Sequence, residues 1–394
     1  MRVCLVYDCL FPWTVGGAER RMRELAEALA AAGHEVTYLT RLQWPLADPP
    51  AIDGVRVVAV SRDEPLYGPD GNRTIGEPLR FGFGVLRHLA RHGREYDVVH
   101  TASFPYFSLL AAGAVRRRGR YRLVTDWHEV WSPEYWRTYV GGPQGVVAHQ
   151  IQRACARIRQ TPFAFSRLHA DRLVDEGLRG TPAVIWEEWA DDARAVLAEP
   201  APAVVAAPEP VVVFAGRFIA EKQAPLAVAA MALAAAEVPG LRGVVLGDGP
   251  ERDAVQAAVA AARSAGAVVD APGFVETAEL HETIRGALCL LAPTRREGYG
   301  LVVIEAASLG VPIVLAAGAD NAATELIEEG VNGFVCADDS AEALAAAVVR
   351  VHAAGPELRR TTLEWHRRHL ERVVAQDPLQ RILDAYSAPP PMPR

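Results

Sequence analysis

Short β-rich runs alternate with helical patterns along this chain, and the alternation stops once and then begins again. Residues 2–7 are typical of a buried strand. Residues 18–32 place Met22 and Leu29 on one face of a helix. Strands and helices that alternate this regularly favour parallel sheets with helices on both faces. We therefore predict an α/β fold.

The interruption divides the chain into two predicted domains. Residues 1–197 form the first, and a proline- and alanine-rich stretch at 198–210 is typical of a linker. The alternation resumes over residues 211–365, which predicts a second Rossmann-like domain. Residues 366–394 are expected to form a C-terminal helix, able to pack back on the first domain, and a disordered tail. Two such domains are expected to face each other across a ligand-binding cleft.

Composition excludes several classes of protein. A formal net charge of -7 argues against a general nucleic-acid binder, which needs a basic surface. No apolar run reaches the roughly 18 residues of a membrane span, and the N-terminus is typical of a strand and not of a signal peptide. Five dispersed cysteines without a Cys-x-x-Cys pair indicate reduced thiols. We expect a cytoplasmic protein without an integral membrane segment.

A glycine pair, Gly16-Gly17, follows the first predicted strand and opens the next helix. Glycine lets bare backbone N–H groups approach a ligand, and the dipole of a helix N-terminus favours anions, so this turn is a candidate phosphate site. A plain tight turn explains the pair equally well. The segment is neither Gly-x-Gly-x-x-Gly nor a P-loop, which argues against oxidoreductases and nucleotide triphosphatases.

Cations and carboxylates cluster in the second half of the chain. Arg217 and Lys222 follow its first predicted strand and can converge on a diphosphate, although two solvated loop cations are the alternative. Glu297 lies in a glycine-rich loop, and Glu305 stands eight positions on in an apolar helical segment. A buried carboxylate needs hydrogen-bond donors, which ribose hydroxyls supply. An exposed helical glutamate is the alternative for Glu305.

These motifs, taken in order, resemble glycosyltransferase family 4 from Met1 to about Val349: Gly16-Gly17, Gly216-Arg217 with Glu221-Lys222, and Glu297-x7-Glu305. The resemblance implies the two-domain GT-B fold and a retaining hexosyltransferase. The implied donor is a nucleotide diphosphate-sugar, with UDP expected before GDP, and no further cofactor is implied. No Asp-x-Asp triplet offers a seat for Mg²⁺ or Mn²⁺, so we expect a metal-independent enzyme.

The same resemblance implies roles for individual residues. Arg217 and Lys222 would stabilise the leaving diphosphate. Glu305 would bind the ribose and Glu297 the donor-sugar hydroxyls. His128 matches the histidine that members of the family direct at the donor sugar, and a structural histidine is the alternative. Further donor contacts are implied for Gly16, Gly17, Gly216, Phe274, Val275, Tyr299, Gly300 and Leu301.

The sequence departs from the family pattern at three places in the donor region. Tyr299 stands where phenylalanine is frequent, which is a mild change. Gln223 stands where glycine is common, so the loop after Lys222 is expected to be shaped differently. Residues 320–325 lack the glycine pair that many relatives carry, which puts that donor contact in doubt.

Aromatic residues near His128 suggest where the acceptor binds. Trp127, Trp131 and the neighbouring Glu129 are candidates for the acceptor side of the first domain, because aromatic rings suit a sugar or another flat molecule. Packing beneath a long loop explains the aromatics equally well. A basic run at residues 116–122 suits an anionic lipid or carrier, or is a solvated helix end. We expect a small-molecule or glycan acceptor, and the oligomeric state is left open.

Two other functions are compatible with these motifs. A nucleotide-sugar epimerase or hydrolase would share the architecture, and a non-catalytic nucleotide-sugar-binding protein would share the donor site. A binding protein has no need of His128. Acceptor-dependent release of nucleotide separates the transferase from both alternatives.

Overall fold

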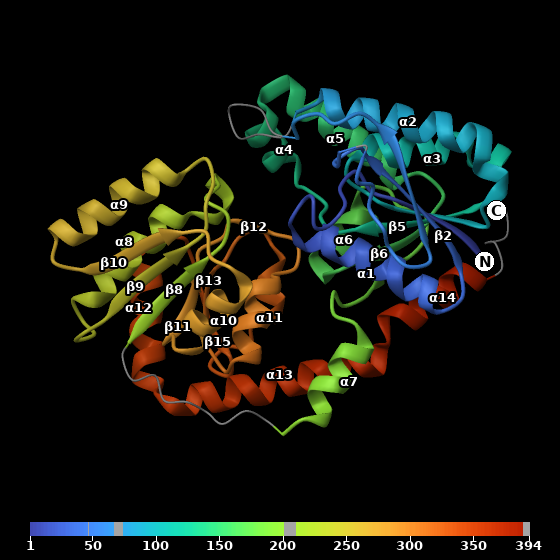
Figure 1. Cartoon of the computed structure of the whole chain (residues 1–394). Helices are drawn as coiled ribbons and strands as arrows, with labels where there is room; N and C mark the ends of the chain where they lie inside the picture. Colours follow the sequence, from blue (N-terminus) through green and yellow to red (C-terminus); the bar gives the residue numbers. More distant parts are fainter. Residues whose placement is uncertain (46, 67–73, 201–209, 389–394) are drawn as a thin grey trace. The chain divides into compact units, whose positions relative to one another are not determined.

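The computed structural model describes residues 1–45, 47–66, 74–200 and 210–388, and it contains two compact α/β units (Figure 1). Unit 1 comprises Met1–Trp189 and the C-terminal segment from Gln376, and unit 2 comprises Ala190–Ala375. The boundary precedes the one predicted at residue 197, because helix α7 (Ala190–Ala198) belongs to unit 2. Most of the expected linker, and the expected tail beyond 388, lie outside the described residues.

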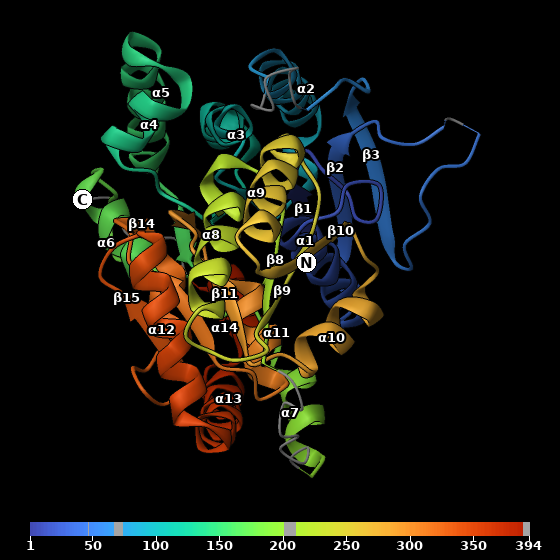
Figure 2. The same cartoon turned by 90° about the vertical axis from the view of Figure 1, so that its left-hand side faces the viewer.

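Unit 1 is built on a seven-stranded parallel sheet with the order β3-β2-β1-β4-β5-β6-β7. Its strands are β1 (Arg2–Val6), β2 (Glu35–Arg41), β3 (Val55–Ser61), β4 (Val98–Ala102), β5 (Arg122–Trp127), β6 (Thr161–Ala164) and β7 (Ala183–Val184). Its helices are α1 (Gly17–Ala31), α2 (Gly76–His92), the 3₁₀ turn η1 (Gly93–Glu95), α3 (Tyr106–Gly119), α4 (Pro133–Val140), α5 (Gly142–Ala156), α6 (Arg167–Asp175) and α14 (Pro378–Ser387). Helices α2 and α3 lie side by side (Figures 1 and 2).

Unit 2 is built on a six-stranded parallel sheet with the order β10-β9-β8-β11-β13-β15. Its strands are β8 (Val211–Ala215), β9 (Arg242–Leu246), β10 (Val268–Gly273), β11 (Cys289–Ala292), β13 (Ile313–Ala316) and β15 (Gly333–Cys336). Besides α7, its helices are α8 (Ala224–Ala235), α9 (Arg252–Ser264), α10 (Thr277–Arg285), α11 (Leu301–Ser308), α12 (Ala341–Ala354), α13 (Pro356–Gln376) and the short 3₁₀ turns η2 (Ala220–Lys222) and η3 (Ala322–Leu326).

The two parallel sheets confirm the predicted α/β fold class. The helical face predicted for α1 is also confirmed, because Met22 and Leu29 are fully buried. Helix α8 is alanine-rich and lies against the second sheet, with Val228 and Met231 fully buried in its core. The apolar periodicity of residues 18–32 therefore located the face of α1 that the core of unit 1 buries.

The strand orders identify where each sheet can hold a ligand. The order reverses between β1 and β4 in unit 1, and between β8 and β11 in unit 2. In open parallel sheets ligands bind beside the carboxyl ends of the strands at such a reversal. The loops after β1, β4 and β5 therefore matter in unit 1, and those after β8 and β11 matter in unit 2.

The C-terminal segment returns to unit 1 as a separate helix. Helix α13 ends at Gln376, and Asp377, with φ 44°, caps α14 by accepting a hydrogen bond from Gln380 N at 3.1 Å. Gln376 Nε2 donates to Val184 O at 3.0 Å, and Arg122 Nη1 donates to Ala385 O at 2.7 Å. The structure thus has two helices in the region where one was expected. None of the helices in the described part of the chain is long and apolar enough to cross a membrane.

His88 on α2 makes the stability of unit 1 sensitive to mild acid. Its Nε2 lies 2.8 Å from Tyr96 Oη, and burial, aided by His92 and Arg56, lowers the pKa of His88 to about 4. The unfolded chain, with a histidine pKa of about 6.5, therefore binds a proton that the folded chain does not. We expect the free energy of unfolding to fall by roughly 2 kcal/mol as the pH falls from about 6.5 to about 4, measured by urea denaturation. An unchanged pH dependence in His88→Gln would contradict this assignment.

Candidate active site

The expected donor-binding residues lie in loops on the carboxyl side of the second sheet. Gly216 and Arg217 follow β8, Phe274 and Val275 follow β10, and residues 296–305 follow β11. Gly216 donates its N–H to Leu246 O at 3.0 Å, which ties the loop after β8 to strand β9. Arg217 and Phe274 are exposed, Phe274 to 68%. The fold thus gathers residues from several separate motifs at one edge, beside the β8/β11 reversal.

Lys222 and Glu297 form an ion pair at this edge, through Nζ and Oε2. Their side chains are 23% and 21% exposed, so a ligand can still reach them. The same two loops are joined by a hydrogen bond from Arg295 N to Glu221 O at 2.9 Å. Lys222 is also the only lysine in the sequence, and the other 40 cationic residues are arginines. That compositional signal singles out Lys222, and the motif comparison had not used it.

Helix α11 begins beside this ion pair. Its N-cap, Gly300, has φ 110°, and a Cβ there would lie 2.8 Å from the Cβ of Ala323, so the position requires glycine. The first N–H groups of a helix have no partner within the helix and suit a phosphate. Tyr299 is buried, Leu301 is 38% exposed, and Glu305 is half-buried one turn further on.

A two-stranded parallel sheet holds the Glu297 loop in place. Strand β12 (Arg296–Glu297) pairs with β14 (Asp320–Asn321). Asn321 is 1% exposed and donates to Thr294 O at 2.9 Å and to Ala316 O at 3.0 Å. The segment that lacks the family's glycine pair therefore supports the loop through a buried asparagine. The motif reading did not predict this pairing.

Gln223, which occupies another atypical position, adopts φ 51° at the start of α8. This backbone conformation favours glycine, and Gln223 is held in it by a hydrogen bond from Nε2 to Asp339 Oδ2 at 3.2 Å. The loop after Lys222 thus has a backbone suited to glycine and contains a glutamine.

Two further glycines pack the loop after β9 against the loop after β8. A Cβ on Gly247 would lie 1.9 Å from Gly216 O, and a Cβ on Gly249 would lie 2.5 Å from Phe218 O. Both have positive φ, at 140° and 156°. The motifs did not predict this contact, although two glycines around Asp248 were a visible signal.

The glycine turn of unit 1 forms the start of α1, as its position predicts. Gly16 is the N-cap, and Gly17 is the first residue of the helix. The preceding loop is held by Gln43, whose Oε1 accepts from Thr14 Oγ1 at 2.6 Å and from Leu10 N at 3.2 Å. The backbone of the turn is therefore fixed by residues outside the motif.

His128 follows β5 and lies against a carboxylate. Its Nδ1 is 3.2 Å from Glu187 Oε1, and its ring stacks on Phe165 with centroids 4.5 Å apart. Among the described residues, Nε2 has no hydrogen-bond partner. A carboxylate on Nδ1 fixes the orientation of the ring and leaves Nε2 as the nitrogen without a partner among the described residues.

Arg21 supports the same carboxylate from α1. Its guanidinium lies 3.5 Å from Glu187 Oε2, donates to Glu187 O, and stacks on Phe165 and Trp189 with 4.7 and 4.2 Å to the ring centroids. Arg21 is 2% exposed. Sequence reasoning missed both Arg21 and Glu187, because Glu187 lies 59 residues after His128 and no local pattern connects them.

The charges around His128 favour its protonated form. Burial by itself lowers the pKa of His128, but the hydrogen bond and charge of Glu187, with Asp126 behind it, outweigh burial and raise the pKa above its ordinary value. A protonated His128 is a hydrogen-bond donor suited to a sugar hydroxyl or a phosphate oxygen.

The predicted acceptor-side aromatics belong mainly to the core of unit 1. Trp127 is fully buried and donates from Nε1 to Gln160 Oε1 at 2.9 Å, so it has no surface to offer a ligand. Trp131 is 8% exposed and donates from Nε1 to Glu129 Oε2. The segment expected to be a long loop contains helix α4, capped by Ser132. Packing in the core therefore explains the presence of Trp127. Trp131 and Glu129 lie at the edge of the same core.

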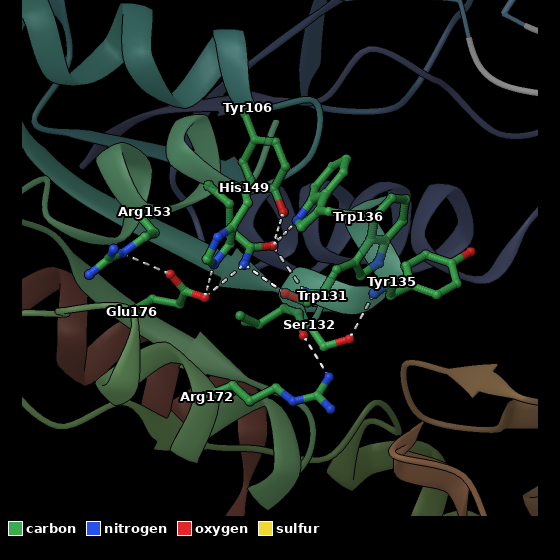
Figure 3. A network of polar contacts seen from close by, with 11 residues as sticks. Tyr106, Trp131, Ser132, Tyr135, Trp136, His149, Arg153, Arg172 and Glu176 are labelled. Carbon is green, nitrogen blue, oxygen red and sulfur yellow. Dashed lines mark hydrogen bonds and ion pairs between the residues drawn. The ribbon is translucent and has the colours of Figure 1, made fainter. Parts of the chain in front are cut away.

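A buried glutamine organises this region. Gln152 on α5 is fully buried, and its Oε1 accepts from Tyr106 Oη at 2.9 Å, Trp131 N at 3.0 Å and Trp136 Nε1 at 3.1 Å. Its Nε2 donates to Trp131 O at 2.9 Å. Figure 3 shows these aromatics around the network, with His149 and Arg153 paired to Glu176 on its left-hand side. The network fixes the chain just after His128 and Glu129.

Comparisons with known proteins agree with this architecture. The model for "Glycosyltransferase Family 4" matches residues 15–194, and that for "Glycosyl transferases group 1" matches residues 199–362. A D-inositol 3-phosphate glycosyltransferase from Xylanimonas cellulosilytica is 31% identical over 331 residues, covering 77% of this chain and 75% of the relative. A glycogen synthase from Mycobacterium tuberculosis is 27% identical over 375 residues, covering 88% and 85%.

Solved structures share the fold. Sucrose-phosphate synthase from Thermosynechococcus elongatus has a TM-score of 0.75 at 22% identity and covers 98% of both chains. Anabaena HepE in complex with UDP and glucose has a TM-score of 0.70 at 17% identity, covering 99% of this chain and 100% of HepE. The fold and the family matches define a GT-B glycosyltransferase that uses a nucleotide-sugar donor. The chain belongs to glycosyltransferase family 4, and the predicted resemblance is confirmed.

Proposed function

We propose that this enzyme transfers a hexose from a nucleotide diphosphate-sugar to a small-molecule or glycan acceptor, with retention of configuration and without a metal ion. The observation that carries the proposal is the Lys222–Glu297 ion pair beside the N-terminus of α11. A cation, a carboxylate and the N–H groups of a helix start therefore lie at one sheet edge. These groups can bind the phosphates and the hydroxyls of a sugar diphosphate.

In this proposal unit 2 binds the donor. Lys222 and Arg217 contact the diphosphate and stabilise the charge that develops on the leaving nucleotide, as a metal ion would. Glu297 accepts hydrogen bonds from donor-sugar hydroxyls. Glu305, half-buried in an apolar helix, accepts hydrogen bonds from the ribose. Tyr299, Gly300 and Leu301 provide backbone contacts at the helix start.

Unit 1 contributes His128 and the glycine turn. Glu187 holds Nδ1 of His128 and leaves Nε2 for a donor-sugar hydroxyl. Gly16 and Gly17 approach the diphosphate from the start of α1. Same-face attack, with the leaving phosphate oxygen accepting the acceptor proton, needs no carboxylate nucleophile, in contrast to the carboxylate pair of retaining glycosidases.

UDP is the first nucleotide to test, followed by GDP, and a panel of nucleotides decides between them. We expect one of UDP, GDP, dTDP and ADP to raise the melting temperature by about 5 °C when supplied at roughly 100 times its Kd, because it binds only the folded state. Glu305→Ala should lose the shift. Glu371→Ala, which removes an exposed glutamate on α13, should keep it. An equal shift in Glu305→Ala would remove Glu305 from the ribose site.

Acceptor dependence tests the transfer step. Release of the nucleotide should rise on addition of the true acceptor. D-inositol 3-phosphate and glycogen are first choices, because two relatives are named for them. Release at the same rate without any acceptor would favour a hydrolase. Binding without release under any acceptor would favour a nucleotide-sugar-binding protein.

A further inference from the structure

A buried polar chain lies behind His128 and reaches the C-terminal helix. Tyr386 Oη on α14 is 2.6 Å from His100 Nδ1 on β4, and His100 Nε2 is 2.9 Å from Asp126 Oδ1 on β5. His100 and Asp126 are fully buried, and Tyr386 is 3% exposed. Tyr386 and His100 are 286 positions apart in the sequence. The donor-site roles described above use none of these three residues.

The proton positions in this chain follow from its charges. Two bare lone pairs 2.9 Å apart would repel, so the His100 nitrogen that faces Asp126 carries a hydrogen. When Nδ1 carries no hydrogen the Tyr386 hydroxyl donates to it, and when the ring is protonated Nδ1 donates to the hydroxyl oxygen. The contact to Asp126 is an ion pair by distance and not a well-aligned hydrogen bond. By contacting Nδ1, Tyr386 therefore orients the His100 ring so that Nε2 faces the carboxylate of Asp126.

Asp126 depends on this support because it is fully buried. Burial by itself raises the pKa of Asp126, but the interactions with His100, Arg21 and His128 outweigh burial and hold the pKa below its ordinary value. A carboxylate that stays ionised in the core is costly without such partners. Asp126 is the last-but-one residue of β5, and His128 follows two positions later.

We propose that Tyr386 is a positioning residue for His128: its hydroxyl orients His100, His100 holds Asp126 in place, and Asp126 sets the charge behind His128. The segment that returns to unit 1 after α13 thus completes the support of the candidate active site. Arg122 fixes that segment by donating to Ala385 O at 2.7 Å. The inference rests on the proposed function only in assuming that His128 contacts the donor sugar.

Three ionisable groups determine the state of His128 in this arrangement. Glu187 lies on its Nδ1 side, Asp126 lies behind it on β5, and Arg21 lies beside Glu187 on α1. Glu187 and Asp126 favour the protonated ring, and Arg21 opposes it. Loss of the Tyr386 hydroxyl weakens only the contribution of Asp126, which raises the pKa of His128. The pKa of His128 is therefore expected to fall.

The test compares two isosteric changes in the full-length chain. Tyr386→Phe removes only the hydroxyl that contacts His100. Tyr121→Phe is the matched control, because Tyr121 is also 3% exposed in unit 1 and its hydroxyl donates to a backbone oxygen, Ala112 O. With ¹⁵N-labelled histidine, the pKa of His128 is read by NMR, and its signal is assigned through loss in His128→Gln.

We expect the pKa of His128 to fall in Tyr386→Phe, to fall further in Asp126→Asn, and to stay at the wild-type value in Tyr121→Phe. If Asp126→Asn does not fold, Tyr386→Phe and its control decide alone. An unchanged pKa of His128 in Tyr386→Phe overturns the proposal, and so does an equal fall in Tyr121→Phe. These readouts need no substrate, so they stand apart from failure of the proposed function.

A second readout applies once a donor and an acceptor are known. We expect kcat to fall roughly tenfold in Tyr386→Phe, as is common when a residue that orients a functional side chain is removed. The Kd for the nucleotide should be unchanged, because unit 2 binds it. A loss of nucleotide affinity equal to the loss of kcat would show a general structural defect and would overturn the positioning role.

Discussion

Lys222→Ala is expected to lower kcat by roughly two to three orders of magnitude, with a much smaller effect on the Kd for the nucleotide. An electrostatic group that acts on charge developing in the transition state contributes on this scale. In the proposed function Lys222 contacts the leaving diphosphate, and in the structure it is paired with Glu297 and about one-fifth exposed. Initial rates at saturating donor, together with a direct binding measurement, separate the two effects.

Lys222→Arg is expected to recover only a small part of this activity. An ammonium is a compact point charge with three rotatable donors, whereas a guanidinium is a planar fork that needs more room. The chain has 40 arginines and one lysine. The presence of that one lysine at this position therefore indicates that the site needs an ammonium group. Full activity in Lys222→Arg would contradict that requirement.

Arg295→Ala is the matched control for Lys222. It removes one cation from the neighbouring loop, where Arg295 is 65% exposed and paired with Asp339 at 2.8 Å. We expect its kcat to stay within about twofold of wild type, because exposed pairs contribute little. An equal loss in both variants would mean that the net charge of the loop matters and not the position of Lys222. Because Lys222 is the only lysine, amine-directed modification protected by nucleotide provides an independent check.

Gln152→Leu is expected to destabilise unit 1 by about 4 kcal/mol. The change keeps the approximate volume but removes the buried acceptor that Tyr106, Trp131 and Trp136 share. Each unsatisfied buried group costs about 1–3 kcal/mol. Urea denaturation followed by tryptophan fluorescence reports mainly on unit 1, because seven of the eight tryptophans precede residue 190.

Gln256→Leu is the control for this loss. Gln256 is exposed on α9 and donates to Ala271 O at 3.3 Å, so its replacement should change stability by less than about 0.5 kcal/mol. A similar small change in Gln152→Leu would mean that the aromatic residues repack without the glutamine. The order of the chain after His128 would then have another cause.

The fold class could be read from the sequence because it depends on periodicity. Alternating strands and helices require apolar residues at the spacing of each element, and the fully buried Met22 and Leu29 show how directly this spacing maps to burial. The break between α13 and α14 was not located, although Asp377-Pro378 was a visible signal. Helix α4 was missed because aromatic residues dominated its short segment.

The candidate donor site could be predicted in part because its motifs are local. A glycine that begins a helix can be recognised without knowledge of the fold. The same is true of two carboxylates a fixed number of positions apart. The pairing of β12 with β14 could not be predicted, because it joins residues about two dozen positions apart through two short strands with no pattern of their own. Trp127 was expected at the acceptor side for its residue type, and burial alone showed that it packs in the core.

By itself, the sequence determined the α/β fold class and the family, and it supplied the donor-side residues as a prediction, because periodicity and short motifs are local properties of a chain. Only the tertiary structure decided which distant residues meet. Glu187 reaches His128, Gln152 collects three aromatic residues, and Tyr386 reaches His100 because the chain returns to unit 1 at its end. Those contacts join polar groups across long stretches of sequence, and burial makes each group depend on a partner that no local pattern names.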